Sequence, residues 1–292
     1  MATKRHKGAL RGVLLAAFCA SLWPFSLGVK AELAVQLAGE GDHPAAAIEF
    51  RRLALEASDK SAGGGYYWAA AHEYWRAGEF GLADKMLDRA EDSAPDLGAS
   101  ALLLRAENAA AAQKWDEASF YLGSVLGSRA GDDAKSLAAR RLAVAEMKRE
   151  DAAAAREALA KSPSKPDTAL AAIDRYEAGR DKSPKLGGVL GMIPGLGYIY
   201  AGEYANGLRS IILNGLFIFG MVDTAQDDEW GAFAAITFFE FTWYSGSIYG
   251  GIDASHRYNR RRLDDCIGGI NGAAAFEPDY TALPTVTLKF KF

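Results

Sequence analysis

Apolar positions recur at helical spacing through the first part of the chain and merge into long apolar stretches in the second part. Residues 31–180 contain 40 alanines, with charged residues between them at helical intervals. Such a composition is typical of soluble helices. Residues 186–252 contain 13 of the 31 glycines and 13 aromatic residues but few charges. The pattern predicts two unlike helical parts, with a boundary near residue 183 that follows a Pro- and Ser-containing connector.

A repeating unit is visible in the alanine-rich part. Its clearest copy lies between residues 66 and 95 and contains Tyr74, the turn Ala77-Gly78-Glu79-Phe80, then Ala83, Leu87, Ala90 and Pro95. Related copies are marked by Gly41-Asp42, Lys114-Trp115 and Arg149-Glu150-Asp151. A spacing of 34 to 37 residues indicates stacked helix pairs, because one pair alone cannot bury its apolar face.

This unit resembles the tetratricopeptide repeat family, in which a small residue on the first helix, a Gly or acidic turn, an Ala on the second helix and a terminal Pro recur. The resemblance covers residues 32–161 and implies an all-α solenoid whose concave surface holds peptides or protein partners and performs no chemistry. A plain helical bundle is the alternative. Tyr66, Tyr67, Trp68, Tyr74 and Trp75 favour a core over a ligand-binding face, because Tyr67, Tyr74 and Trp75 lie at near-helical spacing.

The N-terminus has the pattern of an export signal. Lys4, Arg5, Lys7 and Arg11 precede an apolar run that begins at Gly12. A basic region followed by a short apolar region is typical of a secretory signal, and an uncleaved membrane anchor is the alternative. Residues 1–31 are therefore expected to be a signal peptide or N-terminal anchor, which places the repeats outside the cytoplasm.

Three apolar stretches follow the connector, at residues 186–202, 207–222 and 232–252. About 20 such residues cross the hydrocarbon core, so we expect three membrane-spanning segments. The first two stretches are short, and Pro194-Gly195 divides the first, so a half-span or a re-entrant turn is the alternative. Irregular backbone persists in lipid only when it is buried against other helices, which the glycines would allow.

The placement of charge favours three crossings over two. The loop at residues 223–230 carries four acids and no base, whereas Arg257, Arg260, Arg261 and Arg262 follow the last stretch. Lys and Arg are retained on the cytoplasmic side of membranes. With exported repeats, three spans put these arginines inside and the acidic loop outside, although Arg180, Lys182 and Lys185 then lie outside. Two spans would leave the arginines on the side of the repeats, against the rule.

Residues Lys185-Leu186, Pro194 to Gly202, Gly207-Leu208 and Tyr249 to Asp253 carry a second resemblance. They are similar to the two-transmembrane-helix (TM-two) domain family, which opens on a glycine-rich turn and carries an Asp late in its last helix. The resemblance implies an integral membrane module of poorly defined function. This chain departs from the pattern in having Pro194 and no His or Arg between Gly197 and Tyr200, so a ligand role of that pair does not carry over. The candidate binding or membrane-motif residues are Pro194, Gly195, Gly197, Tyr200, Gly202, Gly207, Arg209, Asn214, Glu240 and Asp253.

Glu240 is the ionisable residue placed well inside an apolar stretch. An intramembrane charge is a functional hypothesis by default, and proton or substrate handling is the function to consider. Arg209 and Asn214 on the preceding stretch are possible partners. A structural hydrogen bond that fixes helix packing is the other interpretation, and we favour it.

Other chemistry is not indicated. The net charge of −4 lacks the basic excess of a nucleic-acid-binding protein. Cys19 and Cys266 cannot form a disulfide framework, and His6, His43, His72 and His256 have no metal-ligand spacing. Gly195-x-Gly197 lacks the third glycine of a nucleotide-binding turn. We therefore expect no metal, no cofactor, no nucleic-acid partner and no enzymatic activity.

The sequence thus predicts an all-α protein with a tetratricopeptide-type α-solenoid followed by a small transmembrane helical module. The expected parts are residues 1–31 (signal or anchor), 32–161 (repeats), 162–185 (connector), 186–256 (membrane module) and 257–292 (basic stretch and tail). The alternation in residues 285–292 favours a strand in the tail. The expected function is a scaffold in the bacterial inner membrane, with periplasmic repeats that bind a cell-envelope protein. The alternative is a transport or assembly component that uses Glu240, with the repeats as its docking arm.

Overall fold

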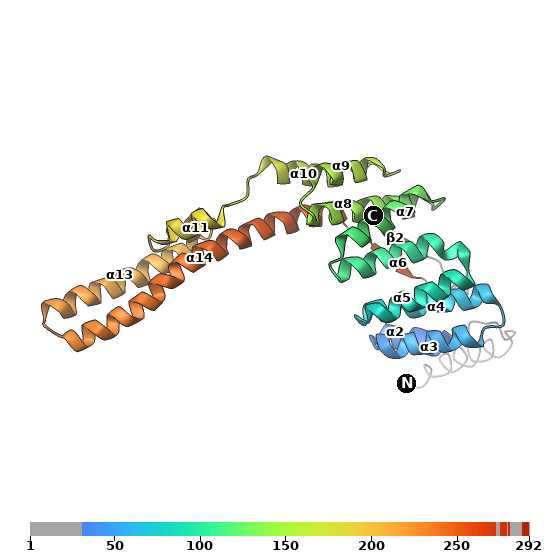
Figure 1. The fold of residues 1–292 in the computed structure, drawn as a ribbon, viewed down its shortest axis with the longest axis horizontal. Coiled ribbons are helices and arrows are strands. Elements are labelled where there is room, and N and C mark those ends of the chain that lie inside the picture. Colours follow the sequence, from blue (N-terminus) through green and yellow to red (C-terminus); the bar gives the residue numbers. More distant parts are fainter. Residues whose placement is uncertain (1–30, 273–274, 279, 281–287, 292) are drawn as a thin grey trace, which may run out of the picture. The chain divides into compact units, whose positions relative to one another are not determined.

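The computed structural model describes residues 31–272, 275–278, 280 and 288–291 (Figure 1). The expected signal or anchor lies outside these residues, except for Ala31. The chain forms two compact units. The repeat unit comprises the described residues of 1–145, 162–164 and 273–292, and the hairpin unit comprises residues 146–161 and 165–272. The division falls within one continuous helix near residue 145, and not near residue 183 where the composition changes.

Successive antiparallel helices build the repeat unit, as Figure 1 shows for its blue to green segments. The all-α class expected from the sequence is confirmed for the described residues, apart from one short strand pair. The elements are α2 (Glu32–Glu40), α3 (His43–Glu56), α4 (Lys60–Arg76), α5 (Phe80–Ser93), the 3-10 turn η2 (Pro95–Leu97), α6 (Gly98–Ala111), α7 (Trp115–Gly127) and α8 (Asp132–Lys148), which continues into the hairpin unit.

The same turn ends α2, α4, α6 and α8. A residue with positive φ follows each helix: Gly41 (84°), Gly78 (78°), Gln113 (59°) and Glu150 (65°). Its N–H bonds to the carbonyl three residues back, and the next N–H bonds to the carbonyl five residues back. This hydrogen-bond pattern is the Schellman motif, which satisfies carbonyls left free at a helix C-terminus. The sequence repeat thus corresponds to a repeated backbone turn, even where glycine is absent.

Alanines allow the helices of the repeat unit to approach closely. Ala46, Ala83 and Ala118 occupy equivalent positions in three copies, and all three are fully buried. Phe50 and Leu87 fill the space between neighbouring helices in the same core. The aromatic residues of the best copy are expected to lie in the core. Three of the five are buried there, and the other two are only partly buried. Tyr66, Trp68 and Tyr74 are buried, whereas Tyr67 and Trp75 are half-buried.

A long two-helix hairpin dominates the second unit (Figure 1). Helix α11 packs along α14, and the short α12 packs against α11, α13 and α14. The elements are α9 (Ala152–Ala160), α10 (Asp167–Ala178), α11 (Pro184–Gly191), α12 (Leu196–Tyr200), α13 (Tyr204–Gln226) and α14 (Trp230–Asn271).

The stretch 186–202 is not a membrane-spanning helix, so the preference for three continuous spans is wrong. The turn at residues 192–195 separates α11, with 8 residues, from α12, with 5 residues. At 1.5 Å per residue, neither helix approaches the roughly 30 Å of a hydrocarbon core. Gly195 has φ 85°, a conformation that ends the preceding helical run. The break at Pro194-Gly195 agrees with the alternative interpretation, in which this stretch does not form one spanning helix.

The expected boundary at residue 256 also differs from the structure. Helix α14 runs to Asn271, so the charged residues after 256 continue the hairpin helix instead of starting a separate tail. The connector contains α10, which packs against α14 and buries Ala169, Ala172 and Ile173. Close packing there places Ala172 against Gly269, where an added Cβ would lie 2.5 Å from the Ala172 Cβ.

The tail contains a strand, β2 (Leu288–Lys291), within the region where alternation favours one. It pairs antiparallel with β1 (Ala275–Pro278), and Phe276 lies opposite Phe290.

Candidate functional site

The predicted membrane-motif glycines meet at a tight junction of α11, α12 and α14. A Cβ on Gly197 would lie 2.5 Å from the Gly187 carbonyl oxygen, 2.8 Å from the Gly251 Cα and 3.1 Å from the Gly191 Cα. Such distances are too short for any side chain, so these backbones touch directly. Gly195 and Gly207 form a similar contact between the turn and α13. Small residues at helix crossings are typical of packing within membranes.

Polar side chains lie at the centre of the hairpin unit. Ser247 on α14 accepts a hydrogen bond from the Gly195 N–H at 3.2 Å and one from the Ser210 hydroxyl at 3.3 Å. Asn214 donates to the Ser210 carbonyl oxygen at 2.7 Å. Ser247 therefore links the broken segment, α13 and α14. A cavity of about 350 Å³ beside it is lined by residues that include Tyr198, Asn206, Arg209, Trp243 and Arg257.

Large apolar side chains of α13 and of the first half of α14 are exposed. The buried residues of α13 are Gly207, Ser210 and Asn214, whereas Leu216 and Phe219 are 63% and 66% exposed. Helix α14 exposes Phe238, Phe239 and Phe241 in the same way. This arrangement inverts the usual rule, in which polar side chains face outward. By length and composition, α13 is the one described helix able to cross a membrane.

An ion-pair network joins the start of α13 to α14. Glu203, which precedes α13, accepts hydrogen bonds from Arg257 at 2.7 and 2.9 Å and from Arg261 at 2.8 Å. Asn206 donates to the same carboxylate at 2.8 Å. The Arg257 hydrogen bonds outweigh the opposing effect of burial, and the pKa of Glu203 falls to about 2. The residues before α13 and those after residue 256 are therefore held at one end of the hairpin.

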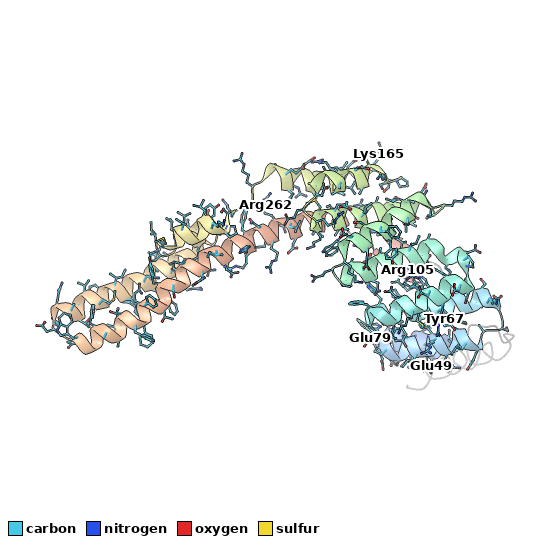
Figure 2. All side chains as sticks on the ribbon, viewed as in Figure 1. Glu49, Tyr67, Glu79, Arg105, Lys165 and Arg262 are labelled. Atoms are coloured by element: carbon cyan, nitrogen blue, oxygen red, sulfur yellow. The ribbon has the colours of Figure 1, made fainter. Side chains whose placement is uncertain are left out.

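The connector is held at that same end. The Lys182 N–H donates to the Asn259 amide oxygen at 2.7 Å, and the Asn259 amide returns a hydrogen bond to the Lys182 carbonyl at 2.9 Å. Arg262, labelled in Figure 2, pairs with Asp181. Three crossings would separate residue 182 from the arginine cluster, and the observed contacts bring them together. The acidic turn at Asp227-Asp228 lies between α13 and α14, at the other end of both helices.

The remaining predicted site residues are distributed around the junction. Tyr200 accepts a hydrogen bond from the Ser183 N–H at 3.0 Å, and the Lys182 ammonium lies 4.8 Å from its ring centre. Pro194 is half-buried in the turn between α11 and α12, and Gly202 has φ 80° in a Schellman turn. Arg209 is exposed and donates to Asn206 at 3.3 Å. Asp253 pairs with Arg257 one helical turn away.

Glu240 does not meet the partners suggested for it. Its side chain is buried at 8% exposure on α14, and its Oε2 atom has no hydrogen-bond partner among the described residues. Arg209 bonds to Asn206, and Asn214 bonds to Ser210. The hairpin therefore contains a buried carboxyl group that its neighbours do not fully satisfy.

The repeat unit contains a second polar cluster, centred on Glu73. This carboxylate on α4 is fully buried. His43 Nδ1 lies 2.7 Å from one carboxylate oxygen, and His72 Nδ1 lies 3.1 Å from the other. Tyr280 donates its hydroxyl to Glu73, and its oxygen lies 2.7 Å from His72 Nδ1. All these contacts are satisfied when each histidine carries its hydrogen on Nδ1.

The charge states of this cluster follow from its contacts. Burial would raise the pKa of Glu73, but hydrogen bonds from His72, Tyr280 and His43 outweigh it, and the pKa of Glu73 lies below its ordinary value. Burial and the negative charge of Glu73 raise the pKa of Tyr280 well above its ordinary value. Glu73 is therefore an anion at neutral pH, and Tyr280 is a neutral phenol that donates to it. Among the described residues, no group of three His, Cys, Asp or Glu side chains is arranged to hold a metal ion.

Sequence reasoning missed both the Glu73 cluster and the Glu203 network. Glu73 follows Tyr66, Ala69 and Ala70 on the buried stripe of α4, so an acid on that apolar face was an available signal. Nothing local marks Tyr280, which is separated from Glu73 by 207 residues.

Comparison with protein-family models, curated proteins and solved structures gives no match to this chain.

Proposed function

We propose that this protein is a membrane-anchored scaffold, in which tetratricopeptide-like repeats bind a protein partner and the α13–α14 hairpin holds them at a bilayer. The outward apolar surface of the hairpin carries the proposal. Ile212, Leu216 and Phe219 are each more than half exposed, and contiguous exposed apolar surface of this kind requires lipid or a protein partner. The 23 residues of α13 extend about 35 Å, enough to cross the hydrocarbon core.

The repeated turns support the tetratricopeptide part of the proposal. Four copies of the same Schellman turn, at spacings of 35 to 37 residues, agree with the family resemblance of the sequence. The glycine junction supports the TM-two resemblance in the same way, because four of the matching glycines, Gly195, Gly197, Gly207 and Gly251, lie where backbones touch.

The hairpin also leads us to revise the proposed topology. The connector and the arginine cluster share one end of the hairpin, so both lie on the side of the membrane where residue 180 lies. We infer from the leader-like N-terminus that this side is the periplasm of a bacterial inner membrane. This side differs from the one that the general preference for cytoplasmic arginines favours, and there Arg257 and Arg261 pair with Glu203 and Arg262 pairs with Asp181.

Photo-crosslinking in intact membranes tests the scaffold function. A photoreactive residue at Phe120, which is 69% exposed on α7, should give a discrete protein adduct. The matched position Phe219, 66% exposed on α13, should give lipid adducts instead. Protein adducts from Phe219 with none from Phe120 or from Leu55, which is 65% exposed on α3, would contradict the proposal.

The unsatisfied carboxyl of Glu240 favours a second candidate, a transport or assembly component in which this residue handles a proton or substrate. Glu240→Gln separates the two functions. The scaffold proposal expects unchanged protein abundance and an unchanged Phe120 adduct. Normal abundance with loss of a proton-coupled flux in reconstituted vesicles would favour the second candidate.

A further inference from the structure

The Glu73 cluster joins two segments that the sequence separates widely. Helices α3 and α4 supply His43, His72 and Glu73, whereas Tyr280 comes from the C-terminal segment that follows α14. The Phe50 ring lies 4.9 Å from the Tyr280 ring, centre to centre, and provides an apolar wall. The C-terminal segment therefore places one aromatic side chain into the core of the first two helix pairs.

We propose that this cluster is the ligand pocket of the repeats, that it selects a tyrosine side chain, and that Tyr280 occupies it as a tethered intramolecular ligand. The proposal rests on the proposed function, because it names the site and the ligand chemistry through which the repeats bind protein segments. A partner that carries a tyrosine would have to displace Tyr280.

The chemistry of the pocket matches a phenol. Glu73 accepts the hydroxyl hydrogen, His72 Nδ1 lies within hydrogen-bond distance of the hydroxyl oxygen, and Phe50 packs on the ring. Phenylalanine has the ring without the hydroxyl, and serine and threonine have a hydroxyl without the ring. Tryptophan can donate but cannot accept. Tyrosine supplies all three contacts.

The pocket also offers hydrogen-bond donors that Tyr280 does not use. The His72 ring stacks on Trp68 at 5.7 Å and packs against Trp75 at 5.6 Å between ring centres. The indole Nε1 atoms of both tryptophans are buried without a hydrogen-bond acceptor among the described residues. Buried donors are normally paired, so a partner segment with hydrogen-bond acceptors next to its tyrosine would pair donors that Tyr280 leaves unpaired.

A tethered occupant makes binding conditional. A ligand linked to its own site acts at an effective concentration that reaches the millimolar range for short flexible tethers. A free peptide of equal intrinsic affinity therefore competes poorly until the tethered side chain is removed.

Peptide binding to the full-length protein in detergent micelles tests the proposal. The probe is a fluorescein-labelled peptide of residues 275–285, measured by fluorescence anisotropy. Tyr280→Ala protein should bind this peptide at least tenfold more tightly than wild type. A peptide with Phe in place of Tyr280 should bind Tyr280→Ala protein about ten- to a hundredfold more weakly, because it lacks the hydrogen bond to a buried carboxylate.

Two variants keep the test decisive. Glu73→Gln combined with Tyr280→Ala should reduce the preference for the Tyr peptide over the Phe peptide to less than about threefold. If Tyr280→Ala does not fold, Tyr280→Phe keeps the ring and should still bind the Tyr peptide more tightly than wild type does. Equal binding of the Tyr and Phe peptides, or no binding by a folded Tyr280→Ala protein, would overturn the proposal. A missing Phe120 crosslink together with normal peptide discrimination would count against the scaffold function and leave the pocket intact.

Discussion

Glycine at residue 113 should stabilise the third helix pair. Gln113 has φ 59° in the turn between α6 and α7, where the equivalent residues of the first two pairs are Gly41 and Gly78. Its hydrogen bonds match theirs: the Gln113 N–H bonds to the Ala110 carbonyl at 3.0 Å, and the Lys114 N–H bonds to the Ala109 carbonyl at 2.9 Å. Only the side chain differs, so the substitution isolates the cost of a Cβ in this conformation.

The expected gain follows from two opposing contributions. A left-handed backbone costs a non-glycine residue about 1–2 kcal/mol. Replacing that residue by glycine loosens the unfolded chain, which offsets about 0.4–1 kcal/mol of the relief. Gln113→Gly should therefore stabilise the α6–α7 pair by about 0.5–1 kcal/mol, and Gly78→Ala should destabilise the α4–α5 pair by a similar amount.

Hydrogen-exchange mass spectrometry of the full-length protein in detergent measures this difference locally. A gain of about 0.5–1 kcal/mol corresponds to roughly two- to fivefold slower exchange in peptides from α6 and α7. Gln113→Ala is the matched control, because it retains a Cβ and should leave the exchange rate within about twofold of wild type. Equal or faster exchange in Gln113→Gly, with no effect of Gly78→Ala, would refute the shared-turn argument.

Three further predictions concern the hairpin unit. Gly197→Ala should destabilise the unit by about 1–3 kcal/mol, measured by thermal unfolding in detergent, because the added Cβ would lie 2.5 Å from the Gly187 carbonyl oxygen. Gly215→Ala is the control, because its added Cβ would meet nothing within 4 Å, and it should not lower the melting temperature. The Glu203 network should stabilise the unit fully above the ordinary carboxyl pKa of 4.5 and lose its effect as the pH falls toward the folded pKa of about 2. Glu203→Gln should remove this dependence of the melting temperature on acid pH and lower the stability of the unit by about 1–2 kcal/mol at neutral pH. This estimate is lowered because Arg257 and Arg261 are partly exposed to solvent, which screens the ion pairs. If the variant and wild type show the same dependence of melting temperature on pH, the role of Glu203 is contradicted. Cys266 is 3% exposed, and burial raises the pKa of its thiol, so maleimide should label it at least tenfold more slowly than a cysteine placed at the exposed Gly268.

The elements with local signals could be predicted from the sequence. Ala46, Ala83 and Ala118 mark buried helix contacts, and Gly41 and Gly78 mark left-handed turns. Gln113 and Glu150 adopt the same turn without a residue type that indicates it, because the hydrogen bonds of the helix end outweigh the local preference.

The remaining errors have physical causes. Hydropathy alone does not separate α11 from α12, although Pro194-Gly195 indicates the break between them. The expected end of α14 at residue 256 is too early, because a helix can continue through charged residues when another helix packs on it, as α10 does here.

The two polar clusters depend on long-range contacts. The carboxylate of Glu203 meets arginines 54 and 58 residues away, and Glu73 meets Tyr280 over 207 residues. No local pattern encodes either contact, although an acid on the apolar stripe of α4 indicates that some partner must be present.

The central proposal is that α13, the one described helix long and apolar enough to cross a membrane, and α14, which packs along it, form a membrane hairpin whose two ends lie on one side. Single cysteines at Arg180, Asp227 and Gly268, in a background without Cys19 and Cys266, test it with a membrane-impermeant maleimide applied to intact cells and to inverted vesicles. The account predicts that positions 180 and 268 label together in intact cells and that position 227 labels only in inverted vesicles. Labelling of positions 180 and 268 from opposite sides would contradict the hairpin, and labelling of all three from one side would contradict the membrane assignment.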